Sequence, residues 1–140
     1  TVVIHKDLEK KLLPKIIKSF KKNNVEIING KWNQEFLGMK VSIKIVDSLN
    51  EAIDFINTYS KKHSEGIIAQ DKNAIDIFCQ SIDSATIFVN SSTRLHDGYV
   101  FGLGSEMGIA TGKLHARGPV GLKELSIYKW IVYGKGHIRK

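Results

Sequence analysis

The residue types best suited to binding chemistry gather in the second half of the chain. Ser91, Ser92 and Thr93 directly precede Arg94, so three hydroxyls and a guanidinium occupy four successive positions. A guanidinium can hold a carboxylate or a phosphate through two parallel hydrogen bonds, and hydroxyls can complete such a site. An ordinary surface arginine explains the string SSTR equally well. The spacing therefore indicates a candidate anion site without deciding for it.

A glycine-dense segment follows this string. Residues 99–122 contain six glycines, and glycine lets the backbone turn sharply or approach a ligand closely at an entropic cost. Gly102, Gly104 and Gly108 form the pattern GxGxxxG, one residue longer than the dinucleotide-binding GxGxxG, and no acidic residue follows at the expected place. The spacing therefore argues against a dinucleotide-binding loop.

The remaining reactive side chains lack the spacing of a known metal centre. His63, His96 and His115, together with Asp97 and Glu106, form no HExxH or CxxC pattern. Metal sites need such spacings because three or four ligands must converge on one ion. We therefore expect no metal site.

Composition indicates one soluble domain. The chain has 140 residues, of which 42% are hydrophobic, enough for a core. It has neither an apolar run long enough to span a membrane nor a signal peptide at its start. The single cysteine, Cys79, suits a reducing compartment, and its place beside Phe78 in an expected helix favours a structural thiol over a nucleophile. We expect a cytoplasmic protein without membrane contact.

The net charge of +7 raises the question of nucleic-acid binding. Residues 7–24 combine an apolar stripe at helical spacing with six lysines, which predicts an amphipathic helix with a solvated lysine face. Nucleic-acid surfaces more often carry arginine and aromatic residues, and the chain has only Arg94, Arg117 and Arg139. Nucleic acid is therefore not the expected partner, although a basic assembly or nucleic-acid-binding domain remains the alternative function.

The order of expected elements predicts an α/β fold. Strands are expected at 41–46, 66–69, 85–90 and 127–134, and helices at 49–60 and 74–82. Alternating strands and helices favour right-handed crossovers and a mostly parallel sheet. Ligands of such sheets collect at the carboxyl ends of the strands, where the string SSTR would emerge.

Three long strings resemble γ-glutamyl phosphate reductase, a family of the aldehyde dehydrogenase superfamily. They are VDSLNEAIDFINTYSKKHSEGI, DSATIFVNSSTR and FGLGSEMGIATGKLHARGPVGL. The family's signature spacing is present as Val46, Ala52, His63, Ser64 and Glu65. The resemblance is weakest over the first 30 residues and specific from Val46 onward. It implies a three-layer sandwich with a mostly parallel sheet, the fold of an aldehyde-dehydrogenase-like catalytic domain.

The resemblance implies a step of proline biosynthesis. The family uses NADPH to reduce L-glutamyl 5-phosphate to L-glutamate 5-semialdehyde and phosphate, through a thioester on a cysteine. That cysteine and the dinucleotide-binding domain are expected upstream of Thr1, and Cys79 does not match the nucleophile. Residues 1–140 are therefore expected to be the C-terminal catalytic-domain portion, without a catalytic residue of their own. Alone, this portion is expected to be inactive and to bind no cofactor.

The resemblance also assigns cofactor-binding positions. Glu35, in QEFLG, matches the glutamate that holds the nicotinamide ribose hydroxyls of NADP(H) in the superfamily. Leu37 stands where an aromatic residue is usual, so the expected contact with the cofactor ring is in doubt. An ordinary surface acid remains the other interpretation of Glu35.

The expected substrate-binding residues come from four short segments. They are His63, Ser64, Ser91, Ser92, Thr93, Arg94, Asp97, Gly102, Gly104, His115 and Arg117. Residues 91–94 would hold the substrate carboxylate, Asp97 would face its ammonium group, and the two glycines would let the backbone crowd the substrate. His63 and Ser64 would border the cleft, whereas His115 and Arg117 are either phosphate contacts or structural pins.

The last residues of the chain are expected to join subunits. Residues 126–140 contain the family-like string YKW and an apolar strand pattern. In the superfamily a C-terminal strand commonly joins a sheet across a subunit boundary, and an unpaired edge favours such addition. We therefore expect a homo-oligomer, a dimer or larger.

Overall fold

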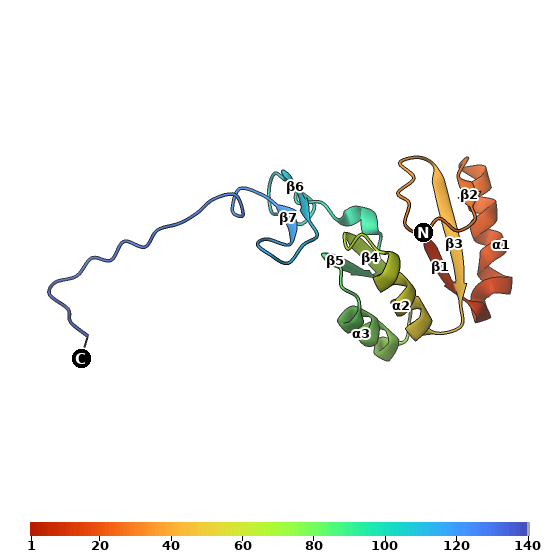
Figure 1. Cartoon of the computed structure of the whole chain (residues 1–140), viewed down its shortest axis with the longest axis horizontal. Coiled ribbons are helices and arrows are strands. Elements are labelled where there is room, and N and C mark those ends of the chain that lie inside the picture. The colour runs from red at the N-terminus through yellow and green to blue at the C-terminus, as the bar shows by residue number, and fades with distance from the viewer. Residues whose placement is uncertain (140) are drawn as a thin grey trace.

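The computed structural model describes residues 1–139 as short strands and helices that alternate along the chain, followed by an extended tail (Figure 1). The elements are β1 (Val2–His5), α1 (Lys6–Lys22), β2 (Glu26–Ile28), β3 (Lys40–Val46), α2 (Leu49–Tyr59), β4 (Ser64–Ile67), α3 (Lys72–Ser81), β5 (Thr86–Val89), the 3-10 helix η1 (Thr93–Leu95), β6 (Gly108–Ala110) and β7 (Gly118–Val120).

The first sheet has the strand order β1-β3-β2, and both pairs are parallel. β3 is central because it is the longest and most β-branched of the three, so it can pair along both edges. Ile4 of β1 and Val46 of β3 are buried. α1 contacts all three strands and leaves its lysines in solvent, but none of its residues is buried, and Leu8 and Leu12 of the apolar stripe are exposed.

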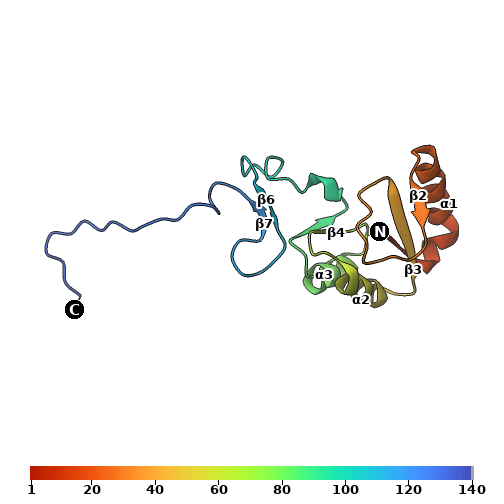
Figure 2. The ribbon, with the colours of Figure 1, turned by 45° about the horizontal axis from the view of Figure 1, so that its top comes forward.

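The second unit pairs β4 with β5 in parallel and covers them with α2 and α3. The two helices lie side by side in both views (Figures 1 and 2). Ile53 of α2, together with Phe78 and Ile82 at the end of α3, forms the core of this unit. Ile67 and Ile87 of the strands pack against it.

Side-chain caps fix where the two helices begin. Ser48 Oγ accepts a hydrogen bond from the backbone N–H of Glu51 at 3.1 Å, and Glu51 Oε2 accepts one from the N–H of Asp47 at 2.7 Å. The first bond is the N-cap half of a capping box, whereas the return bond reaches the N–H of Asp47, one residue before the N-cap Ser48. Asp71 caps α3 through a bond from the N–H of Asn73.

The expected α/β fold with parallel strands is confirmed, but the strands do not join in one continuous sheet. They lie in the β1-β3-β2 sheet, the β4–β5 pair and a small antiparallel β6–β7 pair. Neighbouring strands must approach to about 4.8 Å to share a ladder. Val3 of β1 and residues 64–66 of β4 instead line the same groove, so open space separates the two parallel sheets.

The strand expected at 127–134 does not form within the described chain. The tail extends away from the rest of the molecule and pairs with no strand there (Figures 1 and 2). Ile127, Trp130 and Tyr133 are almost fully exposed. A strand needs a neighbour for its backbone hydrogen bonds, and this segment has none in residues 1–139. Lys140, the last residue of the expected oligomerisation strand, lies outside the described residues.

Two kinds of feature are not found among residues 1–139. No helix there has both the length and the apolar character that a membrane crossing requires. No three His, Cys, Asp or Glu side chains there are grouped so that they would hold a metal ion.

Candidate functional site

A groove of about 640 Å³ separates the first sheet from the β4–β5 unit. Its walls come from β1, from the loop before β3, from α2 and β4, and from the residues that follow β5. Six of the residues expected to bind substrate or cofactor line it. They are Glu35, His63, Ser64, Ser91, Ser92 and Thr93.

The hydroxyl string leaves β5 at the carboxyl end of the β4–β5 pair, as expected for a parallel-sheet site. Asn90 fixes this exit, because its amide Oδ1 accepts from the N–H of Ala69 and its Nδ2 donates to the carbonyl of the same residue, each at 2.9 Å. Ser92 then accepts from the N–H of Arg94 and begins η1. The hydroxyls are thus held at the groove by backbone contacts on both sides.

A chain of hydrogen bonds runs from the groove into the interior. Ser64 Oγ lies 2.8 Å from Nδ1 of His63 and 2.6 Å from Nδ1 of His96. Nε2 of His96 lies 2.9 Å from Oγ1 of Thr86. His96 is only 7% exposed, and its ring stacks on Phe101 with a centroid distance of 5.6 Å.

Two acids line the groove in different surroundings. Glu35 is exposed at its rim. Glu65 is half-buried, and burial raises the pKa of its carboxyl although Ser60 Oγ donates to it at 2.6 Å. The groove is therefore lined by one exposed carboxylate, Glu35, and by one whose ionised form is disfavoured by burial, Glu65.

An aromatic wall completes the groove. Trp32 packs edge-on against Phe55 with a centroid distance of 5.2 Å, and Phe55 lies 5.0 Å from Tyr59. All three rings line the groove. Such a wall can take a planar ring, whereas the hydroxyls and histidines on the β4 side suit an anion.

No family model matches the chain. Single proteins do: γ-glutamyl phosphate reductase from Lachnospira eligens is 44% identical over the whole chain, that from Halothermothrix orenii 42%, and that from Listeria monocytogenes 43% over 99% of it. A crystal structure of the Thermotoga maritima γ-glutamyl phosphate reductase superposes on 99% of the chain with a TM-score of 0.90 and 38% identity. This chain is similar throughout to γ-glutamyl phosphate reductases.

The chain spans 37–38% of the length of these γ-glutamyl phosphate reductases. The alignment with the Lachnospira protein extends over 156 positions, more than the 140 residues present here. That relative therefore carries residues within the aligned region that this chain lacks. The agreement in sequence and structure confirms the resemblance and the α/β fold inferred from the sequence.

Leu37 and Arg94, two positions named from the resemblance to γ-glutamyl phosphate reductase, lie outside the groove lining. Leu37 is 91% exposed and has a φ of +48°, a backbone conformation that disfavours branched side chains. Arg94 is exposed on η1, directly after the groove residue Thr93.

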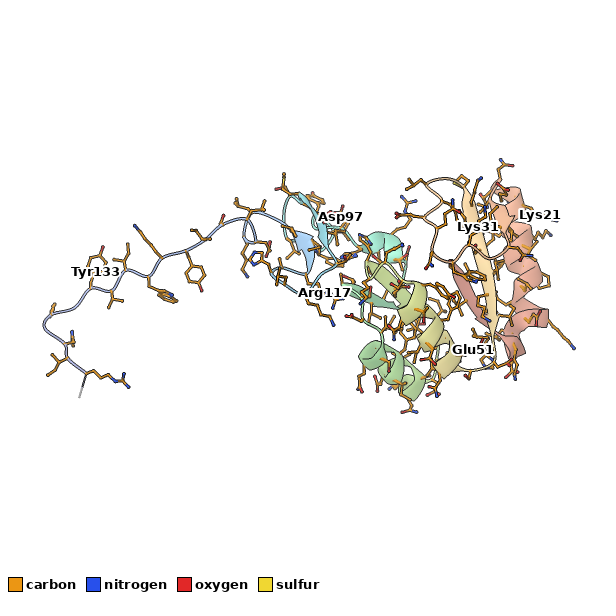
Figure 3. The ribbon with its side chains drawn as sticks, in the orientation of Figure 1. Lys21, Lys31, Glu51, Asp97, Arg117 and Tyr133 are labelled. Atoms are coloured by element: carbon orange, nitrogen blue, oxygen red, sulfur yellow. The ribbon has the colours of Figure 1, made fainter. Side chains whose placement is uncertain are left out.

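Asp97 and the two glycines serve the turn after η1 in this structure. Asp97 Oδ1 accepts from the N–H groups of Tyr99 and Val100 at 2.9 and 3.1 Å, which holds the loop seen beside its label in Figure 3. Gly102 and Gly104 have φ of +72° and +85°, and an added Cβ would meet nothing within 4 Å. The glycines are thus required by the backbone angles and not by a close contact.

His115 and Arg117 lie on the β6–β7 part of the chain and outside the groove lining. His115 Nε2 is 3.2 Å from the carbonyl of Glu124. Arg117 Nη1 is 2.9 Å from Asp83 Oδ1, while its Nε and Nη2 are buried without a hydrogen-bond partner in the described chain. Both side chains contact other parts of the chain in this structure, and Arg117 keeps two donors for a further acceptor.

His96 and the aromatic wall were not singled out as site residues from the sequence. His96 lies 32 positions from Ser64, so no local spacing announces their contact. Phe55 and Tyr59 are spaced i, i+4 on α2, which places them on one helix face. That spacing was a usable signal, although it equally fits an ordinary core face.

Proposed function

We propose that this chain is the C-terminal catalytic-domain part of an NADPH-dependent γ-glutamyl phosphate reductase. The reaction converts L-glutamyl 5-phosphate to L-glutamate 5-semialdehyde and phosphate, a step of proline biosynthesis in the cytoplasm. One observation carries the proposal: the groove collects Glu35, His63 with Ser64, and residues 91–93 from three separate segments. The resemblance to this family had named all of them as ligand contacts.

The residues of the groove suit the proposed cofactor. A carboxylate can accept hydrogen bonds from two ribose hydroxyls, and Glu35 is exposed at the rim for that purpose. The aromatic wall offers a surface for a planar ring, which supports binding of the cofactor. Leu37 does not line the groove. When bound, NADPH supplies a hydride to the acyl carbon.

The same groove suits an anionic substrate. Hydroxyls of residues 91–93 and the imidazole of His63 can donate to phosphate or carboxylate oxygens, and Arg94 adds a positive charge beside them. Thr1 also lines the groove. A cysteine nucleophile shortly before Thr1, as the resemblance implies, would therefore lie near the bound acyl group.

The test uses a polypeptide that contains this chain together with the residues before Thr1. We would measure the reverse reaction, the phosphate-dependent reduction of NADP by glutamate 5-semialdehyde. Glu35→Ala is expected to raise KM for NADP, and Arg94→Ala to raise KM for the semialdehyde or phosphate. Each variant removes a charge-assisted contact, so kcat/KM should fall about ten- to a hundredfold. Asp54→Ala, an exposed acid on α2, is the control and should have no effect.

Absence of activity in the folded polypeptide would contradict the proposal. The basic α1 surface would then be examined as a nucleic-acid-binding face. Salt-dependent retention on DNA that disappears when Lys10, Lys11, Lys21 and Lys22 are changed to Glu would support that alternative.

We also propose that the tail pairs with a second copy of the protein. Residues 127–134 are extended, apolar and exposed. β6 and β7 form a two-stranded sheet, so each has one unpaired edge, which supports the proposal. A homo-oligomer would bury these side chains and complete the hydrogen bonds that the tail lacks in the single chain.

A further inference from the structure

Two polar side chains, Ser42 and His96, are buried in the described chain. Ser42 needs no further explanation, because its Oγ donates to the carbonyl of Gly30 at 2.7 Å. His96 is different, since both of its ring nitrogens contact hydroxyls and one of these hydroxyls lines the groove. A buried imidazole that reaches a ligand site through one serine can influence that site without touching a ligand.

The strand register explains how His96 reaches two hydroxyls. Ser64 of β4 and Thr86 of β5 are directly opposite each other in the parallel ladder. His96, at the end of η1, places its ring between them, with Nδ1 2.6 Å from Ser64 Oγ and Nε2 2.9 Å from Thr86 Oγ1. The ring is further held by Phe101 and Phe88 at centroid distances of 5.6 and 6.2 Å. Its orientation is therefore fixed from every side.

Counting protons shows that these contacts are coupled. Ser64 has one hydroxyl proton but two histidine partners, so it can donate to only one of them and must accept from the other. If Nε2 of His96 donates to Thr86, Nδ1 of His96 carries no proton and accepts a hydrogen bond from the Ser64 hydroxyl. Ser64 Oγ then accepts from Nδ1–H of His63. If His96 carries its proton on Nδ1 instead, the Ser64 hydroxyl turns toward His63 and blocks protonation at that nitrogen.

The charges around His96 keep its ring neutral. Burial is the main cause that lowers the pKa of His96, and a charge on His63, whose ring centroid is 4.9 Å away, lowers it further. Glu106 opposes both effects, but its Oε2 already accepts from the N–H of Gly98 at 2.7 Å. His63, in contrast, is exposed and lines the groove.

We propose that His96 is a positioning residue for anion binding. Thr86 holds His96 as the Nε2–H tautomer, so Nδ1 of His96 accepts a hydrogen bond from the Ser64 hydroxyl. Ser64 Oγ then accepts a hydrogen bond from His63. His63 can then carry a second proton on Nε2 and donate it to an oxyanion, a phosphate or a carboxylate, in the groove. The identity of that anion rests on the proposed function, whereas the coupling of the two histidines rests on the hydrogen bonds alone.

Paired variants separate this role from simple packing. Thr86→Val keeps the shape of the side chain but removes the oxygen that fixes the tautomer, whereas Thr86→Ser restores that oxygen. His96→Asn places an amide near the Nδ1 position and can still accept from Ser64, whereas His96→Gln reaches toward the Nε2 position instead. If His96 and Thr86 only packed the interior, His96→Asn and His96→Gln would weaken phosphate binding equally. Thr86→Val would then weaken it less than Thr86→Ser.

The measurement is made on the polypeptide that includes the residues before Thr1, with ¹⁵N-labelled histidine and inorganic phosphate as the probe. His63→Gln and His96→Asn assign the two ring signals. Binding of phosphate is expected to favour the form of His63 that carries a proton on each ring nitrogen, while the proton of His96 stays on Nε2. Thr86→Val and His96→Gln should weaken phosphate binding about five- to tenfold. Thr86→Ser and His96→Asn should bind phosphate nearly as tightly as the parent protein.

Equal phosphate affinity in Thr86→Val and Thr86→Ser, or a His96 that carries its proton on Nδ1 when phosphate is bound, would overturn the proposal. Should His96→Gln fail to fold, the threonine pair still decides the question, because it leaves the ring in place. Loss of reductase activity in every form, with the histidine response to phosphate intact, would contradict the proposed function and leave the positioning role standing.

Discussion

Oδ1 of Asp83 lies 2.9 Å from Nη1 of Arg117 and thereby connects the end of α3 to the residue before β7 (Figure 3). Lys113 reaches the same oxygen at 2.8 Å, and Lys62 reaches Oδ2 at 3.0 Å. Three cations from two segments, the residue Lys62 before β4 and the loop between β6 and β7, thus converge on one carboxylate. This cluster is where the β6–β7 part of the chain is fastened to the β4–β5 unit.

Replacing Asp83 should make stability less sensitive to acid. Hydrogen bonds from Lys113, Lys62 and Arg117 hold the pKa of Asp83 below its ordinary range. A lowered folded-state pKa stabilises the protein above the unfolded pKa of about 4, and this contribution is lost as pH falls further. Asp83→Asn is therefore expected to lower the free energy of unfolding at pH 7 and to match the parent protein more closely below pH 4.

Urea unfolding at several pH values measures this effect. Asp76→Asn is the matched control, because Asp76 is an exposed aspartate on α3. A difference between Asp83→Asn and the parent that stays constant from pH 7 to pH 3 would show that the carboxylate charge does not fasten the two parts.

Glu65 should have the opposite pH dependence. Burial raises the pKa of its carboxyl, so the ionised form is disfavoured in the folded state. The protonated form contributes stability below the unfolded pKa of about 4.3, and this contribution is lost as pH rises through the folded pKa. Glu65→Gln keeps an acceptor for Ser60 and should raise the melting temperature at pH 7, with a gain that shrinks toward pH 4. Glu35→Gln, at the exposed rim, should show no such gain; an equal gain in both variants would rule out burial as the cause.

The cap of α2 makes a direct contribution to stability. Ser48→Ala removes the acceptor for the N–H of Glu51 and should cost about 1 kcal/mol of unfolding free energy. Ser48→Asp retains a capping oxygen and should stay close to the parent. Denaturant unfolding with an unchanged m-value would attribute the loss to the cap, and a Ser48→Asp variant as unstable as Ser48→Ala would contradict this assignment.

The exposed tail gives a test of the proposed self-association. Ile131→Pro removes a backbone donor and cannot take part in a central ladder, so it should shift the protein toward monomer in sedimentation velocity. Ile131→Val keeps the backbone N–H and the β-branched side chain at the same position and is the control. Emission from Trp130, 84% exposed in the single chain, should move to the red in step with dissociation. An unchanged assembly in Ile131→Pro would exclude the tail as the joining strand.

Local patterns were sufficient for most of the elements. The apolar faces of α2 and α3 and the β-branched run of β3 follow from local spacing, and the structure confirms these elements. The caps at Ser48 and Asp71 are likewise contacts between residues two or three positions apart. The short strands β1, β2, β6 and β7 were not predicted. Each has three or four residues, too few for a periodic signal, and forms because a partner strand is available.

The sequence by itself determined the α/β class, through the alternation of helix and strand patterns, and it named six residues of the groove lining, through strings that resemble γ-glutamyl phosphate reductase. Tertiary structure alone decided which distant polar groups meet. Arg117 contacts Asp83, and His96 lies between Ser64 and Thr86. These contacts join positions up to 34 residues apart. Hydrogen bonds and ion pairs at such separations depend on how whole elements pack, which no local spacing records.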